Sequence, residues 1–125
     1  MDEKDYTLFI EARGSHLFGR ASGVRTRETV TAITNEIFDV AKDNNLSKAL
    51  IDVSELKGKL GIMDSYRVVT EVFQNLRGKG INKAAVYDEQ ASSRREWFLE
   101  TVAQNRGFNF RIFSDLDKAL KWLEL

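Results

Sequence analysis

With 125 residues, of which 42% are hydrophobic and 30% charged, the chain has the size and composition of a single globular domain spanning residues 1–125. Nineteen basic side chains balance nineteen acidic ones, so no nucleic-acid partner is expected, because such binding draws on an excess of positive charge. The lack of cysteine excludes disulfides, thiolate nucleophiles and Cys-based metal sites, and the single histidine, His16, excludes His-rich metal sites.

The sequence predicts a cytoplasmic protein. Met1 is followed by Asp-Glu-Lys-Asp, without the apolar stretch of a secretory signal. No apolar run approaches the roughly 20 residues that cross a bilayer, so no membrane span is expected.

A β-hairpin is predicted at the start of the chain, from Tyr6–Arg13 through Gly14-Ser15 to His16–Ala21. Gly14 tolerates the positive φ that the first position of a type II′ turn requires. The pairs that this turn predicts are Arg13–His16, Ala12–Leu17, Glu11–Phe18, Ile10–Gly19, Phe9–Arg20 and Leu8–Ala21. One face of the hairpin is then apolar or small throughout, and a one-residue slip would destroy that sorting.

Helices and strands are predicted to alternate in the rest of the chain. Thr26 caps a first helix with apolar residues at helical spacing. The expected elements after it are a strand 48–53, a glycine-bearing loop 54–62, a helix starting at Asp64 or Ser65, a strand 81–87, a helix from the capping box Ser93–Glu96 to Gly107, a strand 108–113 and a helix capped by Ser114. The fold class is therefore α/β in the order β-β-α-β-α-β-α-β-α, a mixed sheet with an N-terminal antiparallel hairpin followed by βα units. The order of the strands in the sheet stays open.

Several segments resemble a known family. They are Ala49–Ser54, Ala84–Asp88, Phe98–Gly107 and Arg111–Leu123. Together they are similar to the SpoIIAA-like family, within the STAS (sulfate transporter and anti-sigma factor antagonist) and CRAL-TRIO-like fold group. The resemblance covers nearly the whole chain and implies a bacterial protein with the element order given above. Members of the family mostly have no assigned activity, and a fold alone does not give a function.

The resemblance implies a candidate phosphoacceptor, Ser65. Anti-sigma factor antagonists carry a phosphorylatable serine in an Asp-Ser pair at the start of the helix after the third strand, where this chain has Asp64-Ser65. A phosphate at a helix N-terminus is favoured by free N–H groups and by the helix dipole. Tyr66-Arg67 departs from the small residues that usually follow. The alternative is that Asp64 or Ser65 is only an N-cap.

The fold group also leaves open the binding of a lipid or another apolar small molecule, as in CRAL-TRIO-like proteins. The motivating feature is the glycine-bearing segment Lys57–Ile62, which could form a lid over the apolar second and third helices. The alternative is that Phe73, Leu76, Phe98 and Val102, at helical spacing, form ordinary core.

Polar residues at strand and helix ends form a candidate ligand or partner site, because α/β sheets place ligands there. These residues are Asp52, Ser54, Asp64 and Asp88. A magnesium site is the weaker interpretation of the three aspartates, since the last strand offers no matching lysine, and Asp52 is expected to accept backbone N–H bonds. No metal or other cofactor is expected.

His16 is expected to be an exposed hairpin residue without a nucleophile beside it, so no catalytic residue is predicted and the protein is expected not to be an enzyme.

Phe9, Phe18 and Arg20 are candidate interface residues. If no helix covers the second face of the hairpin, the two aromatic side chains lie exposed among charged neighbours, as in protein interfaces. The alternative is that a helix covers them, with arginine stems at its edge. The sequence therefore favours a non-enzymatic bacterial STAS-type module that acts through a protein partner or self-association, and the alternative is a domain that binds an apolar small ligand.

Overall fold

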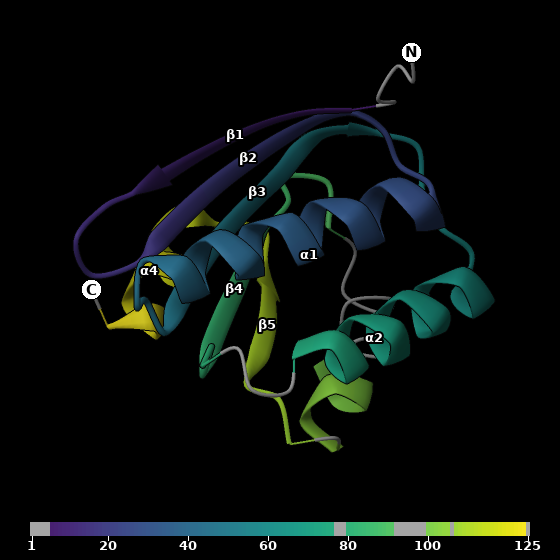
Figure 1. Cartoon of the computed structure of the whole chain (residues 1–125). Coiled ribbons are helices and arrows are strands. Elements are labelled where there is room, and N and C mark those ends of the chain that lie inside the picture. The colour runs from purple at the N-terminus through teal and green to yellow at the C-terminus, as the bar shows by residue number, and fades with distance from the viewer. Residues whose placement is uncertain (1–5, 77–79, 92–99, 106, 125) are drawn as a thin grey trace, which may run out of the picture.

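The computed structural model describes residues 6–76, 80–91, 100–105 and 107–124. They form a five-stranded sheet with helices packed against it (Figure 1). The elements are β1 (Tyr6–Ala12), β2 (Leu17–Val24), α1 (Arg27–Asp43), β3 (Lys48–Lys57), α2 (Ile62–Leu76), β4 (Lys83–Tyr87), β5 (Phe110–Phe113) and α4 (Leu116–Leu123). Residues 100–105 are also helical.

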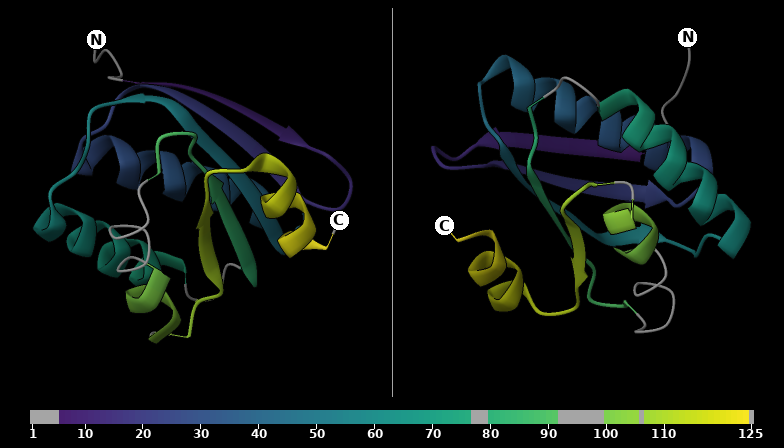
Figure 2. Two further views of the ribbon diagram at one scale, coloured as in Figure 1. Left: turned by 180° about the vertical axis from the view of Figure 1, so that it is seen from behind. Right: turned by 90° about the horizontal axis from the view of Figure 1, so that it is seen from below.

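The strand order follows the chain, β1-β2-β3-β4-β5, which the sequence pattern had left open. β1 and β2 are antiparallel, and every later neighbour is parallel. When successive parallel strands advance in one direction, right-handed crossovers place their connecting helices on one face of the sheet. α1 and α2 lie on that face, and α4, which follows the last strand, lies on the other (Figure 2). The predicted α/β mixed sheet is confirmed.

The hairpin has the predicted register, from Ala12 opposite Leu17 to Leu8 opposite Ala21. Gly14 has the expected positive φ, +78°. The turn type is different, because the Ser15 N–H donates to the Arg13 carbonyl at 2.9 Å and closes a three-residue γ-turn rather than a type II′ turn. The register depends on the turn length and on the apolar face, and both are as predicted.

The larger core lies between the sheet and the α1–α2 layer. Thr26 caps α1 as predicted, since its side chain accepts a backbone N–H of the first turn. α1 buries Ile33, Ile37 and Ala41, one turn apart, against β2 and β3. Gly19 on β2 makes room for this helix, because a Cβ there would lie 2.6 Å from the Ile37 Cδ1 atom.

α4 covers the second face of the sheet. The buried residues of this second cluster are Phe18, Leu50, Ala85, Ala119 and Leu123. The Lys83 ammonium donates to the Trp122 carbonyl at 2.8 Å, and the Lys48 ammonium donates to the Glu124 carbonyl at 3.4 Å. Cations from β3 and β4 thus meet the negative end of the α4 dipole and fix the helix on the sheet.

The C-terminal strands and the last helix begin later than predicted. β4 and β5 each start two residues after the predicted position. Asp115, not Ser114, caps α4, because its carboxylate accepts the Lys118 N–H at 3.2 Å. Aspartate and serine are both good caps, so composition alone did not separate the two neighbours.

Gly107 ends the helix that includes residues 100–105, as predicted. Its φ is +80°, its N–H donates to the Gln104 carbonyl, and the Phe108 N–H donates to the Ala103 carbonyl. These two bonds define a Schellman motif, whose left-handed position favours glycine. The capping box Ser93–Glu96, predicted at the other end of this helix, lies outside the described residues.

β3 extends to Lys57, so the loop predicted over 54–62 is wrong in its first four residues. The cause is a β-bulge, at which Val53 and Ser54 of β3 together face the single residue Ala21 of β2. The extra residue turns Leu56 toward the core, although a strict alternation from Val53 would place it outside.

α2 begins at Ile62, before the residues predicted to cap it. The Ser65 N–H donates to the Gly61 carbonyl at 2.9 Å, which is the hydrogen bond of the first helical turn. Asp64 and Ser65 therefore lie inside the helix, Asp64 exposed and Ser65 buried. The prediction that either residue is the N-cap is wrong.

Candidate functional site

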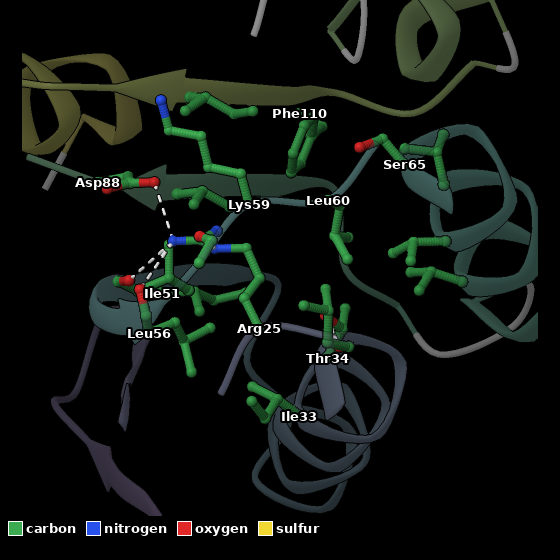
Figure 3. A pocket seen from close by; sticks show the side chains of 18 of the residues that line it. Arg25, Ile33, Thr34, Ile51, Leu56, Lys59, Leu60, Ser65, Asp88 and Phe110 are labelled. Atoms are coloured by element: carbon green, nitrogen blue, oxygen red, sulfur yellow. Dashed lines mark hydrogen bonds and ion pairs between the residues drawn. The ribbon is translucent and has the colours of Figure 1, made fainter. Parts of the chain in front are cut away.

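A cavity of about 150 Å³ lies between the sheet and the α1–α2 layer, beneath residues 58–60 of the loop after β3 (Figure 3). Its walls are mostly apolar. They include Ile33 and Phe38 of α1, Ile51 of β3, Val68 and Val72 of α2, and Phe110 of β5. Engineered apolar cavities of this volume stay dry and bind benzene. The space therefore suits one aromatic ring.

An ion pair borders one side of the cavity. Arg25, between β2 and α1, and Asp88, after β4, are both largely buried, and their Nη2 and Oδ2 atoms lie 3.2 Å apart. The Arg25 Nε atom donates to the Gly58 carbonyl at 3.0 Å, and the Gln90 N–H donates to Asp88 Oδ1 at 3.0 Å. The pair thus joins the ends of three strands and holds the loop over the cavity.

Lys59 and Ser65 also line the cavity. Lys59 makes no hydrogen bond or ion pair with any residue that the structure describes. Ser65 is 3% exposed, and it lines the cavity from α2. Figure 3 shows Ser65 and Asp88 on opposite sides of the cavity. A hydroxyl that lines the cavity can donate a hydrogen bond to a ligand there or accept one from it.

An open cleft of about 310 Å³ adjoins the cavity and shares Arg25, Lys59 and Leu60 with it. The other described residues of the cleft are Thr26, Arg27, Glu28, Asp64 and Arg67. Arg25 is paired with Asp88 at 3.2 Å and Arg27 with Glu28 at 3.6 Å, so Lys59 and Arg67 face the single carboxylate of Asp64, a formal excess of one positive charge. Such a cleft attracts anions.

The residues of the predicted ligand site are divided among three places. Asp88 lines the cavity, and Asp64 lines the cleft. Asp52 lies within β3 rather than at its end, and its Oδ1 atom accepts the Ser54 N–H at 3.0 Å, a backbone N–H bond of the kind predicted. The Ser54 hydroxyl accepts the Glu89 N–H at 3.0 Å. The four predicted residues do not form one site, and the described residues contain no group of three carboxylate or imidazole side chains arranged to hold a metal ion.

Tyr87 lies in an acidic corner on the α4 face. Burial, a hydrogen bond from its hydroxyl to Glu89 at 3.1 Å, and the charges of Glu89, Asp52 and Asp115 all raise the pKa of Tyr87. The phenol therefore stays protonated and acts as a donor to Glu89. This corner belongs to the second face of the sheet and is separate from the cavity.

The predicted interface residues do not form one exposed patch. Phe9, on the edge strand β1, is 52% exposed, but Phe18 is 4% exposed and packs in the α4 cluster. The Arg13 guanidinium lies 4.0 Å from the centre of the Phe18 ring, and that of Arg20 lies 5.3 Å away. For Phe18 the alternative holds, since α4 covers that part of the face and arginine stems close its edge, whereas Phe9 stays exposed.

The start of α2 carries an exposed apolar patch that the sequence analysis missed. Ile62, Met63 and Tyr66 are 66%, 68% and 40% exposed. Helical spacing places Met63 and Tyr66 away from Val68 and Val72, which face the cavity. Ile62 is exposed because it is the first residue of the helix. The signal is present in the sequence, since a helix that begins at Ile62 puts Met63 and Tyr66 outside the inward stripe and leaves Ile62 exposed in its first turn. The later helix start that was predicted hides it.

His16 is buried, at 7% exposure, contrary to the prediction of an exposed residue. Its Nδ1 atom lies 3.2 Å from the Ser15 hydroxyl, and its Nε2 atom has no hydrogen-bond partner among the residues that the structure describes. Burial, followed by the positive charges of Arg13 and Lys48, lowers the pKa of His16.

We expect the free energy of unfolding to decrease as the pH falls from 7 to about 5. The unfolded chain takes up a proton on its single histidine near pH 6.5, whereas the folded chain does so only at lower pH, so acid favours the unfolded state. Urea denaturation of wild type and of His16→Gln between these pH values measures the effect. The free energy of unfolding of His16→Gln relative to that of wild type should rise as the pH falls. A pH-independent difference between the two proteins would contradict the lowered pKa of His16.

Comparisons with known proteins address the fold. No family model and no curated protein matches the chain. Among solved structures, an anti-sigma factor antagonist from Mycobacterium paratuberculosis matches 100% of both chains with a TM-score of 0.61 at 17% identity. An uncharacterised protein of the DUF3478 family with a SpoIIAA-like fold, from Shewanella loihica, matches 98% of both chains with a TM-score of 0.54 at 23% identity. The chain has a SpoIIAA-like fold.

The SpoIIAA-like fold confirms the resemblance seen in the sequence, and at these identities it shows the fold alone. Of the helices that the structure describes, none has the length and apolar character to cross a bilayer. Phosphorylation of Ser65 stays a prediction. A kinase needs an accessible hydroxyl, and Ser65 is buried inside the first turns of α2, so modification would require the start of this helix to open.

Proposed function

We propose that this SpoIIAA-like chain is a non-enzymatic module that acts by binding another protein through the start of α2. The observation that carries the proposal is the exposed apolar patch of Ile62, Met63 and Tyr66. The similarity in fold to an anti-sigma factor antagonist, a protein that by its name counteracts another protein, supports it.

The patch has the composition of an interface centre. Burial of a side chain the size of Ile62 or Met63 contributes about 1.5–3 kcal/mol, which makes them suitable anchors. Asp64 and Arg67, on the same turns of α2, line the charged cleft and give the patch a polar border. A partner that covers the patch would therefore place apolar side chains at the centre of the contact.

The test is a double substitution, Ile62→Ser with Met63→Ser. A tagged wild-type chain retrieves the partner from an extract of the source cells, and calorimetry on the two purified proteins then gives Kd. We expect the double variant to bind at least about tenfold more weakly with an unchanged circular dichroism spectrum, because both side chains are exposed in the free protein.

Phe9→Ser is the matched control, since it also removes an exposed apolar side chain, and it should keep the wild-type affinity. An unchanged affinity in the α2 double variant would refute the proposal. Loss of binding in Phe9→Ser instead would place the contact on the β1 edge. Light scattering of the same variants tests the self-association predicted for the surface of Phe9, Phe18 and Arg20, because β1 lies at the edge of the sheet, where a strand of a second copy can pair.

A second candidate function, the binding of a small apolar molecule, is favoured by the cavity beneath residues 58–60. Its volume of about 150 Å³ suits a ring-sized molecule better than a lipid with full acyl chains. The patch residues Ile62, Met63 and Tyr66 do not line the cavity, so the two functions use different side chains and can be tested separately.

A further inference from the structure

We infer that the cavity binds a small aromatic carboxylate, with its ring among the apolar walls and its carboxylate beside Lys59. The inference rests on the second candidate function and names its ligand class. It does not depend on the protein contact at the start of α2.

The ring is assigned from the volume and the walls. A space of about 150 Å³ between Phe38, Val68, Val72 and Phe110 is large enough for one ring and too small for a long chain. A ring buried among such side chains gains free energy in proportion to the apolar area it removes from water. The interior of the cavity therefore selects for an apolar body of this size.

The carboxylate is assigned from the charges at the cavity border. The Arg25 charge is already matched by Asp88 at 3.2 Å, whereas Lys59 has no ion-pair partner in the described part of the chain. The adjoining cleft adds Arg67, since Arg27 is paired with Glu28 at 3.6 Å, and it has an excess of positive charge. An anionic group is favoured there, and a cationic group is not.

Ser65 favours a ligand with a hydroxyl group at the opposite side of the cavity. Ser65 lines the cavity, and its side chain lies across the space from Asp88 (Figure 3). A ring that carries a hydroxyl group on the side away from its carboxylate can bond to it. We therefore expect 4-hydroxyphenylacetate to bind more tightly than phenylacetate.

The experiment is a titration of the ¹⁵N-labelled full chain with phenylacetate, followed by nuclear magnetic resonance. Saturable shifts should be confined to residues around the cavity, with a Kd in about the millimolar to micromolar range for a ligand of this size. Lys59→Gln should weaken binding by about tenfold, because the carboxylate loses its cation. Lys57→Gln is the matched control, since this neighbouring lysine is exposed and does not line the cavity, and it should bind as wild type does.

Three further probes separate the possible results. Val68→Phe fills the cavity and should abolish the shifts. This core change can also unfold the protein, and in that case Lys59→Gln tests the inference in its place. Phenylacetamide, the uncharged counterpart, should bind about tenfold more weakly than phenylacetate. Ser65→Ala should remove the preference for the hydroxylated ligand.

Equal binding of phenylacetate and phenylacetamide, with no effect of Lys59→Gln, would overturn the anion assignment and leave apolar binding in the cavity standing. No saturable shift with either compound at about 10 mM would overturn both the anion assignment and the binding of an apolar group in the cavity. Tighter binding of palmitate than of phenylacetate would overturn the size argument in favour of a lipid.

Discussion

Replacement of Gly19 by valine is expected to lower the free energy of unfolding by about 3 kcal/mol. A Cβ at this position would lie 2.6 Å from the Cδ1 atom and 3.1 Å from the Cγ1 atom of Ile37. Ile37 is fully buried and does not line the cavity, so its side chain has no open space to move into. The sheet and α1 would have to separate, which weakens contacts along the whole helix.

A second substitution isolates that clash. Ile37→Ala alone should lower the free energy of unfolding by about 2–5 kcal/mol. The double variant with Gly19→Val should lose about 1–2 kcal/mol less than the sum of the two single losses, because the valine methyl groups occupy the space that Ile37 vacates. Urea denaturation monitored by circular dichroism measures all four proteins. Ile33→Ala is the control partner, since Ile33 is buried on the same helix but is not among the nearest atoms to the Gly19 site, and its effect should add to that of Gly19→Val. Strictly additive effects of Gly19→Val and Ile37→Ala would contradict the close approach of β2 to the Ile37 side chain.

The features that sequence analysis predicted correctly depend on residues that are close along the chain. The hairpin register follows from Gly14-Ser15 and from the alternation on either side, and the Thr26 and Gly107 helix ends follow from local capping chemistry. In each case, a few neighbouring side chains decide the backbone conformation, so the pattern contains the information.

The features that it missed are decided by distant parts of the chain. Phe18 is buried because α4, from the other end of the sequence, packs on its face of the sheet. The extension of β3 depends on a bulge against β2, which shifts Leu56 inward. The same holds for the candidate site, since the cavity lies between the sheet and the helix α2, which packs on α1, and no local pattern gives its volume.

Arg25 shows most clearly why the site was only partly predicted. Its position in the sequence, just before a helix cap, suggests a solvated charge. In the structure its backbone N–H donates to the Lys57 carbonyl at 2.8 Å, and its guanidinium reaches Gly58 and Asp88, from two other connections of the sheet. Asp88 was predicted from its place after a strand, but its partner could be found only from the folded arrangement.

Arg25→Met should therefore be among the most damaging substitutions outside the central core, with a loss of about 3 kcal/mol in the free energy of unfolding. The methionine keeps the apolar stem but removes the cation, which leaves the Asp88 carboxylate mostly buried without its charged partner. The Gly58 carbonyl also loses its donor, so the loop over the cavity is released. Denaturant unfolding measures the loss.

The double variant Arg25→Met with Asp88→Asn shows whether the orphaned carboxylate is the cause. Asparagine keeps the side-chain oxygen that accepts the Gln90 N–H but carries no charge, so the double variant should be more stable than Arg25→Met alone. Arg25→Lys keeps the charge without the forked geometry and should fall between wild type and Arg25→Met. If Arg25→Met stays within about 0.5 kcal/mol of wild type, the pair is an ordinary surface contact and does not hold the loop over the cavity.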